Sequence, residues 1–304
     1  MDGAELEARF AVPGVLGFET TDSGLVRARV TAASAEATIY LHGAHVTHWM
    51  PSGQEPVLFL SERTELAAGR PIRGGVPVIF PWFGPRHDGR QGPQHGFART
   101  AEWALEFAAV AGDEVHLLLT LGPSAESRAL GYDHFRLAYR VIVGRTLTLE
   151  LTVANTSNAM DAVLAFEEAM HAYYAVADVR EATVSGLAGT AFLDKVDEMQ
   201  EKVQAEAALA FTRRTDRVYR HTTATCAIDD IAGKRKIRIE KMGSHTTVVW
   251  NPWSELAATM ADMEPDAWPR MLCVETANVG ESAVTLVPGA THTMRATVSV
   301  EGGD

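Results

Sequence analysis

Cysteines are scarce in this chain, and long apolar runs are absent. Only Cys226 and Cys273 occur, each flanked by apolar or small residues. Two thiols in so long a chain are typical of reduced core residues rather than of a disulfide framework. No run of about 18 apolar residues is present, and the N-terminal segment carries acids where a signal peptide has its apolar stretch. We therefore expect neither a membrane span nor a secretory signal, which predicts a cytoplasmic protein.

Basic residues are also few, since 27 Lys and Arg stand against 39 Asp and Glu, giving a formal net charge of −12. This balance opposes general binding to nucleic acid or to an anionic membrane, so we expect neither as a partner. An anionic ligand would have to meet a local basic cluster. The chain also lacks a phosphate-binding P-loop, a dinucleotide fingerprint and a paired C-x-x-C motif.

Three histidines, His42, His45 and His48, lie close together in the sequence. In an extended chain residues 42 and 48 point one way and residue 45 the other, and Gly43 interrupts the segment. Three ligands on one ion are not expected from that spacing. The sequence therefore predicts no metal and no cofactor.

Alternating apolar and polar residues, rich in β-branched types, recur along the chain and predict half-buried strands. The clearest segments are 114–121, 137–143, 146–153, 236–240 and 293–300. Because there are many strands, few helices and no βαβ rhythm, we expect an all-β fold, a large antiparallel β-sandwich in one domain over residues 1–304.

Helical signals are few. Ser254, followed by ELAATM, predicts a short capped helix. Residues 162–175 fit either a strand or a helix, and residues 194–211 are rich in helix formers although pairing with other strands can override that preference. Both segments stay open between strand and helix.

Glycine and proline are concentrated in residues 71–99, where they alternate with aromatic, histidine and arginine residues such as Trp82, His95 and Arg99. Glycine permits close approach of the backbone and proline fixes its direction, as in the wall of a binding cleft. A surface loop anchored by aromatic residues fits the same composition.

Four further residues could take part in chemistry, although each also has an ordinary structural explanation. His171 lies in an apolar segment, where a lone histidine is more often structural. Glu275 follows the apolar residues 271–274, so a strand could deliver a carboxylate at its end, or the carboxylate could simply enter solvent there. Arg73 and Arg99 bracket the Gly/Pro-rich segment and suit a phosphate, although surface arginines are common.

Taken in order, a set of short segments resembles the glucose-6-phosphate 1-epimerase branch of the aldose 1-epimerase family. The resemblance covers about residues 40–290. The segments are LHGAHVTHW, FLSE, PIRGGVPVIFPWFG, QHGFAR with EW following, AMHAYYAV, DRVY, VVWNPW, MADM and CVETANV. Two departures occur, because MHAYY stands where the family has LHTYF, and the NPW block continues as SELAAT where a lysine is expected.

This resemblance implies a galactose mutarotase-like supersandwich with an active site on a concave sheet face. It implies that His171 is the general acid and Glu275 the general base. The substrate-binding residues that it implies are Arg73 and Arg99 for a phosphate, His95 as a sugar contact, and Asp216 in DRVY for sugar hydroxyls.

The implied reaction interconverts the α and β anomers of an aldohexose 6-phosphate, with D-glucose 6-phosphate as the expected substrate. It needs one acid and one base and no cofactor. A nearby carboxylate is expected to raise the pKa of His171 and keep it protonated. The alternatives are an aldose 1-epimerase for unphosphorylated sugars and a non-catalytic sugar-phosphate-binding protein. We expect a monomer.

Overall fold

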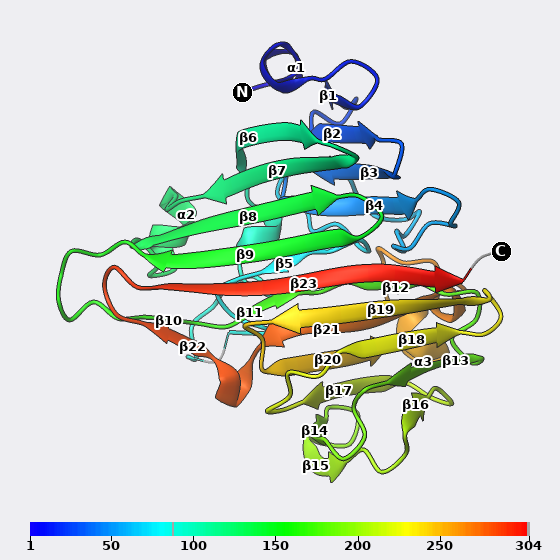
Figure 1. Cartoon of the computed structure of the whole chain (residues 1–304). Helices are drawn as coiled ribbons and strands as arrows, with labels where there is room; N and C mark the ends of the chain where they lie inside the picture. Colours follow the sequence, from blue (N-terminus) through cyan, green and yellow to red (C-terminus); the bar gives the residue numbers. More distant parts are fainter. Residues whose placement is uncertain (87, 303–304) are drawn as a thin grey trace.

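Antiparallel sheet makes up most of the regular structure in the computed structural model, which describes residues 1–86 and 88–302 (Figure 1). The predicted all-β class is confirmed. Two large sheets face each other in this part of the chain, and a four-stranded and a two-stranded sheet flank them. The expectation of one domain over the whole chain stays a prediction.

The nine-stranded sheet contains every strand predicted from a clear alternation. In order across the sheet its strands are β16 (Ala208–Ala210), β13 (Ala182–Ser185), β18 (Cys226–Asp230), β19 (Arg235–Met242), β23 (Thr291–Gly302), β9 (Leu147–Asn155), β8 (Phe135–Val143), β7 (Glu114–Leu121) and β6 (Ala104–Ala111). Odd-numbered residues of β8 and β9 are buried and the others are not, as the alternation predicts.

The eight-stranded sheet carries the residues discussed below. Its strands follow the order β15 (Gln200–Val203), β14 (Ala191–Asp194), β17 (Thr215–Tyr219), β20 (Thr246–Asn251), β21 (Met271–Asn278), β11 (Glu168–Met170) and β5 (Val78–Ile79), and β12 (Tyr173–Ala175) also pairs with β21. The flanking sheets consist of β1 (Leu16–Thr20), β2 (Val26–Thr31), β3 (Ala35–Tyr40) and β4 (His45–Pro51), and of β10 (Leu164–Phe166) with β22 (Val284–Leu286).

The two segments left open by the sequence are strands. Residues 162–175 contain β10, β11 and β12, and residues 194–211 contain the end of β14 together with β15 and β16. Their backbone groups pair with neighbouring strands, so tertiary pairing outweighs the helix preference of residues 194–211.

Helices are short. They are α1 (Gly3–Phe10), α2 (Ala125–Ala129) and α3 (Trp253–Ala257), with 3₁₀ turns at Ala98–Thr100, Trp268–Arg270 and Gly280–Ser282. The helix predicted after Ser254 begins two residues earlier, at Trp253, and its N-cap residue Pro252 makes no side-chain capping bond, so Ser254 is not the cap. No helix in residues 1–86 and 88–302 has the length and apolar character needed to cross a membrane.

Strand β21 separates two environments. Leu272 and Val274 point into the core between the two large sheets, where they join the main cluster of buried apolar side chains. Because side chains alternate along a strand, Cys273 and Glu275 lie on the opposite face. Both cysteines are buried free thiols, as predicted.

The Gly/Pro-rich segment covers this second face. Phe83 packs there against Val248 and Ala277. The chain reaches the face through Gly74 and Gly75, which have positive φ angles of 113° and 59°. A Cβ at Gly75 would lie 2.3 Å from the carbonyl oxygen of Val46, so a larger residue would force the strands apart. This close approach explains why both positions of the IRGG motif are glycine.

A buried polar network connects the two large sheets. Glu168 on β11 is fully buried, and its Oε1 lies 3.0 Å from Nε2 of His292 on β23. Asn278 on β21 donates a 2.8 Å hydrogen bond to the same oxygen. The side-chain hydrogen bond from His292 to Glu168 raises the pKa of His292 above 6.5, although partial burial opposes it.

This pair makes the stability of the protein depend on pH. Because the folded-state pKa of His292 is raised, its contribution is complete below the unfolded-state value of about 6.5 and is lost as the pH rises through the folded value. We expect His292→Gln to lower the free energy of unfolding more at pH 6 than at pH 9, measured by urea denaturation. The exposed His134→Gln serves as the control, and an equal loss at both pH values would contradict this role.

Candidate active site

Five of the six residues implied by the resemblance line one pocket on the outer face of the eight-stranded sheet, with a volume of about 170 Å³. They are Arg73, His95, His171, Asp216 and Glu275. They come from the Gly/Pro-rich segment, from the residue after β11, and from β17 and β21. Long loops and non-adjacent strands thus place Arg73 and Glu275, which are 202 positions apart in the sequence, against one cavity.

His171 and Glu275 are close together. Nε2 of His171 lies 3.3 Å from Oε1 of Glu275, and the two side chains are 10% and 1% exposed. The contact lacks hydrogen-bond alignment, and within the described residues both oxygens of Glu275 and Nδ1 of His171 are buried without a partner. Glu275 lies inside β21 rather than at its end, so the sequence expectation of a strand-end carboxylate is wrong.

Stacking and backbone bonds fix the His171 ring. It stacks on Tyr173 with ring centres 4.9 Å apart and planes 14° apart, as expected for alternate residues of an extended chain. The amide of His171 donates to the carbonyl of Pro77, and that of Tyr173 donates to the carbonyl of Gly75. The Gly/Pro-rich segment therefore holds the imidazole in place.

Burial controls the charges of this pair. It lowers the pKa of His171 to about 3, with further lowering by Arg73, Arg99 and Lys195. Burial also raises the pKa of Glu275 well above 4.5, and the nearby Asp216 adds to this effect. The expectation that a carboxylate would keep His171 protonated is therefore wrong for the free protein, because desolvation outweighs the attraction.

His95 faces the pair from the Gly/Pro-rich segment. Its ring lies 5.5 Å from that of His171 and 4.8 Å from that of Phe83, centre to centre. Its Nδ1 accepts a hydrogen bond from the amide of Gly84, which places the proton of the neutral ring on Nε2. Burial lowers the pKa of His95 well below 6.5, so the ring is a neutral donor.

Arg73 and Arg99 are not equivalent. The guanidinium of Arg73 lies 2.9 Å from a carboxylate oxygen of Asp262 and donates a 2.8 Å hydrogen bond to the hydroxyl of Tyr173. Arg99 is not among the residues that line the pocket, but it donates a 2.7 Å hydrogen bond to the carbonyl of Gln94, which is. Burial lowers the pKa of Arg99 to about 10, and the charge of Arg73 also lowers it.

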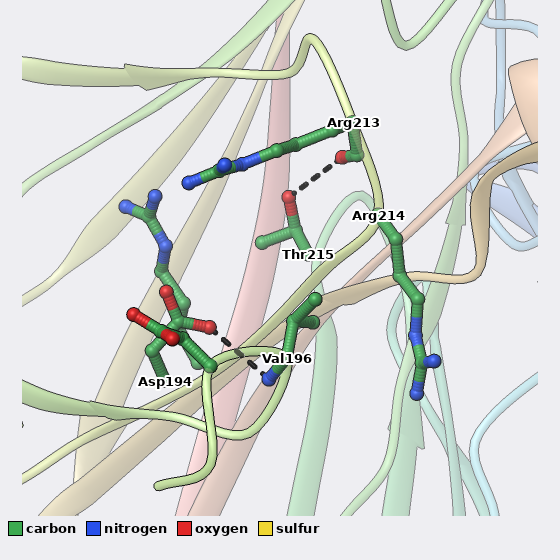
Figure 2. A pocket seen from close by; sticks show the side chains of 7 residues that line it. Asp194, Val196, Arg213, Arg214 and Thr215 are labelled. Carbon is green, nitrogen blue, oxygen red and sulfur yellow. Dashed lines mark hydrogen bonds between the residues drawn. The ribbon is translucent and has the colours of Figure 1, made fainter. Parts of the chain in front are cut away.

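Two cations that the sequence reasoning missed also line the pocket, Lys195 and Arg214. Both lie near Asp216, and their charges lower its pKa, although burial raises it overall. Figure 2 shows that the side chains of Arg213 and Arg214 leave the chain in different directions; both line a neighbouring cavity, and only Arg214 also lines this pocket. No local pattern marks these two residues, because their position depends on the order of strands in the sheet.

His42 and His45, which lie close together in the sequence, bind backbone carbonyl groups. Nε2 of His42 bonds the carbonyl of Arg70, and Nε2 of His45 bonds the carbonyl of Gly74. They hold the loop that presents Arg73. In the part of the chain that the structure describes, no group of His, Cys, Asp or Glu has the arrangement of a metal site.

Comparison with known proteins identifies the family to which this chain belongs. Residues 28–299 match the family described as Aldose 1-epimerase. A "Putative glucose-6-phosphate 1-epimerase" of Escherichia coli is 37% identical over 248 residues, which cover 81% of each chain. One of the same name from Cenchrus ciliaris is 33% identical over 277 residues, covering 88% of this chain and 83% of the relative.

Solved structures with a similar fold agree with this family assignment. The crystal structure of a "putative mutarotase" from Salmonella typhimurium is 33% identical and covers 96% of each chain with a TM-score of 0.88. A galactose 1-epimerase from Lactobacillus acidophilus shares the fold at 12% identity, with a TM-score of 0.72 over 95% of this chain and 99% of the other. The chain belongs to the aldose 1-epimerase family. It is an isomerase of the mutarotase type, and its substrate is a sugar.

The charge state of His171 can be tested directly. We expect its imidazole to stay neutral in the free protein from pH 8 down to pH 5, because burial and three nearby cations lower its pKa to about 3. The measurement is an NMR titration of histidine ring nitrogen shifts, with His171→Asn to assign the signal. A midpoint near 6.5 would contradict this.

Proposed function

We propose that the protein interconverts the α and β anomers of an aldohexose 6-phosphate, with D-glucose 6-phosphate as the substrate. The observation that carries the proposal is the buried His171–Glu275 contact of 3.3 Å inside a pocket with excess positive charge. The names of the relatives from Escherichia coli and Cenchrus ciliaris point to the same substrate.

The reaction requires one proton to leave the anomeric hydroxyl and one to reach the ring oxygen. Glu275 removes the proton from O1 while His171 protonates O5, so that the C1–O5 bond breaks and an aldehyde forms at C1. Rotation about the C1–C2 bond presents the other face of the aldehyde. The two residues then exchange roles, O5 attacks C1, and the ring closes as the other anomer.

The geometry of the pair suits this sharing of protons. An uncharged pair, with neutral His171 and protonated Glu275, holds as many protons as an imidazolium beside a carboxylate. One proton therefore has only to move between two groups 3.3 Å apart to produce the acid and base required. A phosphate dianion beside Arg73 and Arg99 would offset the cations that lower the pKa of His171, and so favour the imidazolium form once substrate is bound.

Positive charge supports a phosphate at one end of the sugar. Arg73, Lys195 and Arg214 line the pocket against two acids, Asp216 and Glu275, and burial favours the protonated form of Glu275. Asp262 already neutralises part of the charge of Arg73, which is the observation that favours an unphosphorylated substrate instead. Arg99, without a carboxylate partner in the described residues, would supply the additional charge.

The remaining residues orient the sugar. His95 would donate its Nε2 proton to a sugar oxygen, and Asp216 would accept hydrogen bonds from hydroxyls. Fixing the phosphate and the hydroxyls at two ends places C1 and O5 between Glu275 and His171, so that binding energy positions the reacting atoms.

Removing the carboxylate should act on turnover more than on binding. We expect Glu275→Gln to lower kcat for anomer exchange at least about 100-fold, because a general acid or base contributes about 10² to 10⁴ in rate. KM should change little, since the amide keeps the size of the side chain. Polarimetry on freshly dissolved α anomer measures both constants, and a nearly normal kcat would remove Glu275 from the mechanism.

The phosphate site is tested by comparing D-glucose with D-glucose 6-phosphate. We expect kcat/KM to be at least tenfold higher for the phosphate ester, since a charge-assisted bidentate contact contributes about 1.5–3 kcal/mol. Arg99→Met should remove most of that preference by lowering kcat/KM for the phosphate ester more than for glucose. Equal kcat/KM values for the two sugars would instead favour an epimerase of unphosphorylated sugars.

A further inference from the structure

The turn between β14 and β15 brings Lys195 into the pocket. Its ammonium nitrogen lies 3.7 Å from Oδ1 of Asp216 and 5.4 Å from the centre of the Phe83 ring. At 3.7 Å the contact with Asp216 is longer than a direct hydrogen bond. The side chain of Lys195 is 33% exposed, so its ammonium can turn its donors toward a bound molecule.

Ion pairs and backbone bonds hold this turn. Asp194, which is 5% exposed, accepts hydrogen bonds from the amide of Val196 and from the ammonium of Lys202, at 3.1 and 2.8 Å (Figure 2 shows the first). The amide of Lys195 donates a 2.8 Å hydrogen bond to the carbonyl of Asp216. The backbone of Lys195 is therefore fixed beside Asp216, and only its side chain is free to adjust.

The pocket residues lie in a fixed order across the eight-stranded sheet. Arg73 bonds Tyr173, which stacks on His171; Glu275 follows on β21, and Asp216 on β17 comes next but one in the sheet. With the phosphate on C6, the ring edge continues through C5, O5 and C1 to C2. In the orientation of the proposed function, with the phosphate beside Arg73, Asp216 on β17 and the adjacent Lys195 would lie on the side of the hydroxyl next to the anomeric carbon.

We propose that Lys195 is a specificity-determining residue that donates a hydrogen bond to the C2 hydroxyl of the substrate while Asp216 accepts one from it. This inference rests on the proposed function for the orientation of the sugar. A hydroxyl both donates and accepts, so an ammonium and a carboxylate together satisfy it. The turn at Lys195 also supplies the pocket with a lysine, where the block after Trp253 has none.

The test compares D-glucose 6-phosphate with 2-deoxy-D-glucose 6-phosphate. Anomer exchange by saturation-transfer NMR gives kcat/KM, and calorimetry gives the dissociation constant of each sugar. The variants are Lys195→Met, which keeps the aliphatic stem, Lys195→Arg, which keeps a charged donor, and Lys236→Met on the nine-stranded sheet as a matched control.

The native enzyme should favour the sugar with the hydroxyl by about ten- to one-hundredfold, the range for a hydrogen bond to a charged group. Lys195→Met should reduce this ratio of kcat/KM values at least fivefold by slowing the exchange of D-glucose 6-phosphate. Lys195→Arg should keep most of the ratio, and Lys236→Met should keep all of it. The ratio isolates the contact, because loss of charge near Glu275 affects both sugars alike.

An unchanged ratio in Lys195→Met, or equal losses on both sugars, would overturn the assignment and leave Lys195 a structural or purely electrostatic role. Failure of the proposed function gives a different result, namely no faster exchange of either sugar by the native protein. In that case the ratio of dissociation constants still decides whether Lys195 contacts the C2 hydroxyl.

Discussion

The burial of Glu275 is the constraint on which the site depends. A buried carboxyl group without a hydrogen-bond partner among the described residues is unfavourable, and the sheet must supply the stability that offsets it. Strand β21 does so by placing Val274 in the core between the two large sheets while Glu275 lies on the opposite face. The same burial raises the pKa of Glu275 and lowers that of His171, so the pair holds a proton that can pass between the two groups.

Rigid elements surround this pair. His171 is fixed by stacking on Tyr173 and by backbone bonds to the segment that passes through Gly75, where no larger residue fits. Glu275 lies inside β21, and groups on strands are held more closely than groups on loops. Three cations, Arg73, Lys195 and Arg214, line the pocket beside this pair.

The sequence predicted the all-β class and the strands with clear alternation, because alternation depends only on which residues are neighbours. It left residues 194–211 open, since their helix preference is overridden by pairing that is non-local. The resemblance brought His171 and Glu275 together, but neither the pairing of Arg73 with Asp262 nor the position of Lys195 could be predicted, because both depend on the order of strands. The sequence analysis predicted a raised pKa for His171, whereas burial lowers it. That prediction was wrong because the burial of a side chain cannot be obtained from a local pattern.

The central claim is that His171 and Glu275 work as one proton-transferring pair. The most direct test measures the rate of exchange between the α and β anomers of D-glucose 6-phosphate by saturation-transfer NMR, for His171→Asn, Glu275→Gln and the double variant. If the pair acts as a unit, the double variant exchanges anomers about as slowly as the slower single variant, because effects within a unit are not additive. Losses that multiply in the double variant, or exchange near the native rate in either single variant, would contradict the account.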